Sequence, residues 1–242
     1  MLLQPQLDEL GFAIVDPAIE QACIDPLIRV IDTLENGGRR SRQGGVRDVL
    51  RRLPDLPRII NHPAVTSLVR AGLGPAAFAV RGVVFDKNAT ANWKVPWHQD
   101  LTVAVQGRTD VDGYGPWSSK EGVAHVQPPV HVLEQMIAVR IHLDDCGPSN
   151  GPVRVLAGTH RLGRLSNEAI TEAQQRHREI TCSVRRGGLL AMRRITTRSS
   201  GRTRVSRPVW GTGRAGASRS LSSTLVCWAD PRKRNDLPKL FA

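Results

Sequence analysis

A histidine and an aspartate two residues apart, His98 and Asp100, stand out in this sequence as residues that could do chemistry together. On a β-strand, side chains at positions i and i+2 project from the same face, so this imidazole and this carboxylate would lie side by side. Such a pair supplies two of the three protein ligands in the facial triad that holds iron(II) and leaves coordination positions open. The same spacing recurs at His142 and Asp144. Either pair could instead be the polar outer face of a strand, and spacing alone does not decide.

The elements that must position these residues change character along the chain. Apolar residues recur at helical spacing from Ile19 to Leu34, after an Asp16-Pro17 pair that suits a helix start. A second short helix fits residues 63–71, and the Asn150-Gly151 pair is a hairpin signal. Strand patterns begin only after the helices, at 77–85, 97–105, 136–143, 153–156 and 187–192. This order predicts an α+β domain built on an antiparallel sandwich or barrel.

A segment rich in glycine and proline, residues 106–135, interrupts the strands. An irregular loop of this length inside a compact domain is usually a lid or a binding loop. We therefore expect Tyr114, Trp117 and His125 to gate the site or to contact the substrate. A solvated surface insertion is the alternative.

Composition indicates a globular protein with no membrane span. Hydrophobic residues make up 40% of the chain, and no stretch approaches the length of about 18 apolar residues that a membrane helix needs. The segment from Met1 to Asp16 has no basic region, so we expect no signal peptide. The four cysteines are far apart in the sequence, which favours reduced thiols and a cytoplasmic location. The sequence does not indicate an oligomeric state.

The net charge of +12 is concentrated near the C-terminus. Residues 193–242 contain 12 of the 34 Lys and Arg residues but only 2 of the 22 Asp and Glu residues. A nucleic-acid interface needs a basic patch on a folded surface with aromatic side chains nearby, and residues 1–192 show neither. We therefore expect no nucleic-acid partner. Binding of nucleic acid through the basic tail is the alternative.

Three segments together resemble the phytanoyl-CoA dioxygenase family. They are residues 85–102, with Trp97-His98-Gln99-Asp100; residues 142–146; and residues 149–161, with Asn150-Gly151 and Gly158-Thr159-His160-Arg161. The resemblance implies a double-stranded β-helix (a jelly-roll, cupin-like fold) with N-terminal helices. It also implies Fe(II), 2-oxoglutarate as cosubstrate, O2 and a small-molecule substrate.

The family pattern carries over to particular residues of the chain. The resemblance implies that His98 and Asp100 are metal ligands, with no further catalytic residue, and that a third histidine follows on a late strand. An arginine beyond that histidine usually binds 2-oxoglutarate. No tail arginine has the family context, so Arg140, which shares a strand face with His142, is the candidate. An outward-facing Arg140 on the surface is the alternative.

The sequence departs from the family pattern after Arg193. No histidine follows His177, so the third ligand is absent. We expect a dioxygenase-like domain at 1–192, with its double-stranded β-helix core from about residue 77, and an aberrant basic tail at 193–242. Either the protein is an oxygenase impaired by the missing histidine, or it is a non-catalytic jelly-roll binding protein. The tail could be disordered or translated in a shifted frame, since residues 195–200 can be back-translated so that reading one base later gives Leu-Leu-Leu-Val-His-Arg.

Overall fold

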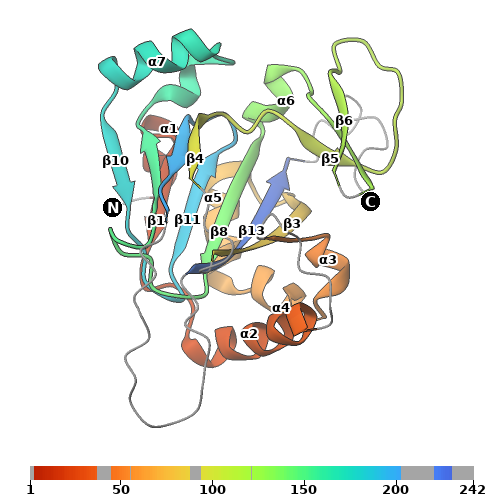
Figure 1. Ribbon diagram of the computed structural model, residues 1–242, viewed down its shortest axis with the longest axis vertical. Helices are drawn as coiled ribbons and strands as arrows, with labels where there is room; N and C mark the ends of the chain where they lie inside the picture. Colours follow the sequence, from red (N-terminus) through yellow and green to blue (C-terminus); the bar gives the residue numbers. More distant parts are fainter. Residues whose placement is uncertain are drawn as a thin grey trace.

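The computed structural model describes residues 3–36, 45–54, 56–87, 94–120, 122–202 and 221–230. The helices are concentrated in the first third of the chain, as the apolar periodicity predicts. They are α1 (Leu3–Glu9), α2 (Gln21–Asn36), α3 (Val49–Arg52), α4 (Leu56–Ile60), α5 (Pro63–Leu73), α6 (Val130–Glu134) and α7 (Asn167–Arg176), with a 3-10 turn at Thr159–Leu162. Figure 1 shows α2, α3 and α4 grouped together at one end of the molecule and α7 at the other.

The strands form three antiparallel sheets. The large sheet has the order β1-β11-β8-β13-β3-β2, the second β10-β9-β12-β4, and the small third sheet β5-β7-β6. Their bounds are β1 (Phe12–Val15), β2 (Gly45–Arg47), β3 (Phe78–Lys87), β4 (Val95–His98), β5 (Val103–Val105), β6 (Trp117–Lys120), β7 (Val123–Val126), β8 (Met136–His142), β9 (Val153–Leu156), β10 (Glu179–Cys182), β11 (Leu189–Arg193), β12 (Arg198–Ser200) and β13 (Leu221–Ala229).

Successive residues of β8, a central strand of the large sheet, are buried on both faces and pack alternately into two different clusters. On β8, Ile137, Val139 and Ile141 pack with the helices in one core cluster. Met136 and Ala138 face the other way, into a cluster that contains residues of β5, β7 and β13. The sheets therefore enclose an apolar interior while the helices cover the outer face of the large sheet, and the predicted α+β jelly roll is confirmed.

The strand predicted at 97–105 is two strands in two different sheets. β4 ends at His98 and belongs to the second sheet, whereas β5 begins at Val103 in the third. Asp100 therefore lies in the connection between them. The predicted hairpin at Asn150-Gly151 is also wrong, since β8 and β9 flank it in different sheets. Gly151 adopts φ +61° there, against the backbone of Gly201.

Two local predictions need a physical correction. The Asp16 carboxylate accepts hydrogen bonds from Arg185 and does not cap a helix, and α2 begins only at Gln21 and continues through Pro26. The segment 106–135, expected to be irregular, contains strands β6 and β7 and helix α6. β6 and β7 pair, from Trp117 opposite Val126 to Lys120 opposite Val123, so part of this segment forms a regular main-chain ladder.

The C-terminal segment contributes strands to both main sheets. β12 lies between β9 and β4, and β13 lies between β8 and β3. Residues 203–220 and 231–242 lie outside the described residues, and the division of the chain at residue 193 stays a prediction. Among the described residues, no helix combines the length and the apolar composition needed to cross a membrane.

Candidate metal site

His98 ends β4 with its ring oriented by the main chain. Its Nδ1–H donates to the Pro96 carbonyl at 2.9 Å, which leaves Nε2 with a lone pair, and Nε2 lies 3.7 Å from Asp100 Oδ1. Burial, and secondly the positive charge of Arg198, lowers the pKa of His98 to about 4. The imidazole is therefore neutral at pH 7, the form that binds a metal, and a carbonyl-bound Nδ1–H is the usual support for a ligating histidine.

Gln99 positions Asp100 even though Asp100 lies outside the strand. Its side-chain amide is buried and donates to the carbonyls of Gly163 at 2.9 Å and Ile195 at 2.7 Å. Its Oε1 accepts from the Leu165 amide at 2.9 Å. Three hydrogen bonds to distant segments hold the connection after β4 in one conformation, so the middle residue of the H-x-D pair is a positioning residue. Sequence reasoning missed this role because the residue's partners are more than 60 positions away.

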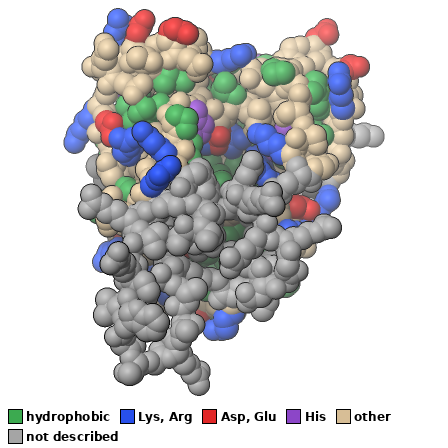
Figure 2. Space-filling model, viewed as in Figure 1, with side chains coloured by type: hydrophobic (Ala, Val, Ile, Leu, Met, Phe, Trp, Pro, Cys, Tyr) green, Lys and Arg blue, Asp and Glu red, His purple; other side chains and the backbone are tan. Residues whose placement is uncertain are grey.

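Two arginines of the C-terminal segment converge on Asp100. Arg198 forms an ion pair with Asp100 Oδ2, and Arg194 Nη1 lies 3.5 Å from the same oxygen. Arg194 also donates to the Thr102 carbonyl at 2.5 Å and to the Cys227 sulfur at 3.0 Å. Near the centre of the face in Figure 2, histidine, acidic and basic side chains lie close together. Because both arginines lie in the tail that the sequence predicts outside the domain, the sequence does not predict their position at Asp100.

The donor set does not fit an iron ion held by three protein ligands. His98 and Asp100 are close enough to share an ion, but Arg198 neutralises the other oxygen of Asp100. Arg198 also lies directly opposite His98 in the pairing of β12 with β4, and an arginine offers a metal no lone pair. Among the described residues, the one group of three potential ligands is Glu20, Cys23 and His62, which includes neither His98 nor Asp100.

The second H-x-D pair has a different environment. His142 is 1% exposed, and its Nδ1 has no hydrogen-bond partner among the described residues. Burial, and secondly repulsion by Arg140, lowers the pKa of His142 to about 3. Arg140 itself lies over the Phe85 ring, with its guanidinium carbon 5.3 Å from the ring centre. The cosubstrate role of Arg140 stays a prediction.

The three residues of the predicted lid do not share one environment. Tyr114 and Trp117 pack against the apolar cluster inside the sheets, and Trp117 also lies 5.9 Å from the Arg108 guanidinium. His125 is buried on β7 and lines a cavity. Their contact with a substrate stays a prediction.

Comparisons with known proteins agree with this architecture. A family model described as phytanoyl-CoA dioxygenase (PhyH) matches residues 21–208. A comparison with curated proteins gave no match.

Solved structures with the same fold have low sequence identity to this chain. AviO1 from Streptomyces viridochromogenes Tue57 is 18% identical, with 95% of this chain and 94% of that chain covered and a TM-score of 0.64. EctD from S. alaskensis with bound Fe is 12% identical, with coverage of 95% and 76% and a TM-score of 0.66. The epimerase SnoN in complex with Fe3+, alpha ketoglutarate and nogalamycin RO is 15% identical, with coverage of 94% and 82% and a TM-score of 0.68. At these identities the likeness concerns the fold alone.

Proposed function

The chain belongs to the phytanoyl-CoA dioxygenase family, and from this premise we propose that it is an Fe(II)- and 2-oxoglutarate-dependent oxygenase whose metal site is impaired. Family membership and the structural neighbours support an oxygenase of this class in general. The proposed substrate is a small molecule, with O2 and 2-oxoglutarate as the other reactants. His98 and Asp100 are the proposed metal ligands.

One observation supports the proposal that the metal site is impaired. Arg198 stands opposite His98 across the β4–β12 pair and is bound to the carboxylate that should hold the metal. Burial lowers the pKa of Arg198 only to about 10, so its guanidinium is charged at pH 7. A cation already bound to Asp100 competes with a metal ion for that carboxylate and offers no lone pair in return.

The same observation favours a second candidate function, a non-catalytic jelly-roll binding protein. In that case the Arg198–Asp100 ion pair is a permanent substitute for the metal, and ligands bind without turnover. The two candidates differ in what happens when the arginine is replaced.

Substitution of Arg198 by histidine is the decisive experiment. Arg198→His removes the competing cation and places an imidazole opposite His98, so we expect iron affinity to rise by more than about 10-fold. Iron stoichiometry of the purified protein and succinate formation from 2-oxoglutarate are the measurements. Arg176→His, at an exposed position on α7, is the matched control and should change neither. If Arg198→His binds iron no better than the unchanged chain, the assignment of this site is wrong.

The choice between the two H-x-D pairs is tested in the Arg198→His background. A further His98→Ala change should abolish iron binding, because it removes the neutral imidazole beside Asp100. A further His142→Ala change should leave iron binding in place, although it lowers stability because His142 is buried. Iron binding that survives loss of His98 and disappears with loss of His142 would reverse the assignment.

A further inference from the structure

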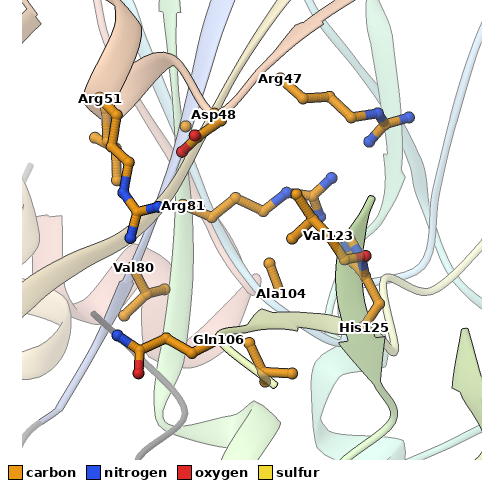
Figure 3. A pocket seen from close by; sticks show the side chains of 12 residues that line it. Arg47, Asp48, Arg51, Val80, Arg81, Ala104, Gln106, Val123 and His125 are labelled. Atoms are coloured by element: carbon orange, nitrogen blue, oxygen red, sulfur yellow. The ribbon is translucent and has the colours of Figure 1, made fainter. Parts of the chain in front are cut away.

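A cavity of about 130 Å³ lies between the large sheet and the small third sheet. Arg47 of β2, Arg51 of α3 and Arg81 of β3 line one side of it, and Val123 and His125 of β7 line another. Figure 3 shows Arg81 extending from β3 toward Val123 and His125. The volume is several times what one water molecule needs, and it suits the charged end of a small molecule.

Positive charge dominates the described lining of this cavity. Asp48 is the one acidic residue there, against the three arginines. Lys120, on the neighbouring β6, responds to the same charges: burial, then repulsion by Arg81 and Arg47, lowers its pKa. Cations that raise one another's energy in a partly buried space are stabilised by a bound anion.

His125 adds a specific hydrogen-bonding position. The side chain is 1% exposed, and its Nδ1–H donates to the Val123 carbonyl at 2.9 Å. The Nε2 atom is therefore the acceptor, and it has no partner among the described residues. Burial, opposed in part by the Val123 hydrogen bond and reinforced by Arg81, Lys120 and Arg47, lowers the pKa of His125 to about 4. A buried acceptor without a donor costs free energy, which a ligand hydroxyl or amine would recover.

The cavity is connected to the candidate metal site through β5. Ala104 and Val105 line the cavity and follow Asp100 within five residues. Thr102 lies between Asp100 and Ala104 in the chain. Its hydroxyl accepts a hydrogen bond from Lys120 Nζ at 3.4 Å, and its carbonyl accepts one from Arg194 Nη2 at 2.5 Å. Arg194 in turn lies 3.5 Å from Asp100. A molecule held in the cavity would therefore contact β5, the strand that follows Asp100 in the chain.

We propose that this cavity binds the anionic end of a small molecule, a carboxylate or a phosphate held by Arg47, Arg51 and Arg81, which also carries a hydroxyl or amine that donates to His125 Nε2. As a statement about the substrate, the proposal rests on the proposed function. Binding of an anion in the cavity needs no iron, so binding is tested without metal. The result is therefore independent of the oxygenase assignment.

Calorimetric titration in the presence of a metal chelator tests the proposal. The probes are malate and glycerol 3-phosphate, which have an anionic group and a hydroxyl, and succinate, which has carboxylates alone. We expect malate or glycerol 3-phosphate to bind, and to bind more tightly than succinate. If only malate binds, the cavity is a carboxylate site, and if only glycerol 3-phosphate binds, it is a phosphate site. Failure of both to bind at millimolar concentration would overturn the proposal, as would equal affinity for succinate.

Variants separate the cavity from general surface charge. Arg81→Gln should weaken binding by about 10-fold or more, because it removes a charge-assisted hydrogen bond, and Arg51→Gln, at the more exposed edge, should weaken it in the same direction. His125→Gln should reduce the preference for the hydroxyl-bearing probe. Arg176→Gln on α7 is the matched control and should bind as the unchanged chain does. Arg81→Gln and Arg51→Gln proteins that unfold at the normal temperature and bind with undiminished affinity would contradict the assignment.

Discussion

Arg198 lies directly opposite His98 in the antiparallel pair of β12 with β4, and its guanidinium is bound to the carboxylate that follows His98 by two residues. The side chains of Arg194 and Arg198 are 2% and 8% exposed, and that of Asp100 is 31% exposed. The charges of two nearly inaccessible arginines are thus compensated by one carboxylate. The removal of one partner from such a group leaves an uncompensated buried charge, which is far more costly than the loss of a surface ion pair.

Replacement of Asp100 should therefore destabilise the fold as well as the metal site. We expect Asp100→Asn to lower the free energy of unfolding by about 3 kcal/mol, measured by urea denaturation of the metal-free protein. The double variant Asp100→Asn with Arg198→Met should recover part of this loss, because methionine keeps the apolar contacts and removes one stranded charge. A single variant as stable as the unchanged chain would mean that the Arg198–Asp100 pair contributes nothing.

Two adjacent threonines before β12 are equally buried, but we expect their replacement by valine to change the free energy of unfolding in opposite directions. Thr196 and Thr197 are both 0% exposed. The Thr196 hydroxyl donates to the Gly11 carbonyl at 2.9 Å, whereas the Thr197 hydroxyl has no partner among the described residues. We expect Thr197→Val to raise the free energy of unfolding by about 1 kcal/mol and Thr196→Val to lower it by a similar amount. Urea unfolding of the pair is the measurement, and changes of the same sign would contradict the assignment of the hydrogen bonds.

The regular elements of this fold could be predicted from periodicity because their apolar residues face one partner each. Helix α5 begins at Pro63 as expected and extends to Leu73, and β3, β8, β9 and β11 cover most of the residues with strand patterns. The H-x-D spacing correctly placed His98 beside Asp100. The reason differed, however, since Gln99 and its distant partners hold Asp100 in a connection between sheets.

Other features could not be predicted because they depend on tertiary contacts. The change from β4 to β5 leaves the apolar pattern unbroken, so nothing local marks a passage between sheets. β1 and β2 are short edge strands of the large sheet, and propensity is weakest at such positions. The arginines at Asp100 give no signal in the sequence, because a run of Arg, Thr and Ser has no strand periodicity and is typical of a tail outside the domain.

Stability should fall as the solution is acidified below about pH 6, and His142 should account for part of the loss. Burial, and repulsion by Arg140, lowers the pKa of folded His142 to about 3, whereas an unfolded histidine titrates near 6.5. Between these values the unfolded chain binds the proton and the folded chain does not, so the unfolded state gains stability as the pH falls. We expect a loss of roughly 2 kcal/mol from this side chain between about pH 6 and about pH 4.

The measurement is the pH dependence of urea unfolding. His142→Gln should flatten the slope in that range, because glutamine does not titrate. His131→Gln, at an exposed position on α6, is the matched control and should leave the slope unchanged. An unaltered slope in His142→Gln would show that His142 does not titrate as described.

The segment 194–200 is buried, but most of its side chains are polar. All seven residues are at most 7% exposed, a location that calls for an apolar strand. Six of the seven are instead Arg, Thr or Ser. Of the nine buried side-chain atoms without a hydrogen-bond partner among the described residues, four belong to this segment: Arg194 Nε, Thr197 Oγ1, Arg198 Nη1 and Ser199 Oγ. Buried polar atoms are nearly always paired in native proteins, so this cluster indicates a sequence foreign to its position.

We therefore predict that the gene sequence across residues 193–200 encodes, one base later, an apolar strand that ends in histidine. The back-translated repair, Leu-Leu-Leu-Val-His-Arg over 195–200, would replace Thr197 with leucine and Ser199 with histidine, which removes both unpaired hydroxyls, and would remove Arg198 from Asp100. It puts the histidine at the place of Ser199, next to the residue that lies opposite His98. The pairing of β12 with β4 is irregular at this place, between Arg198 and Ser200. Sequencing the gene across this junction is the test. An early stop codon in the shifted frame, or the lack of a histidine codon opposite Ser199-Ser200, would end the idea. If the codon is present, the corrected chain should bind iron where the present one does not.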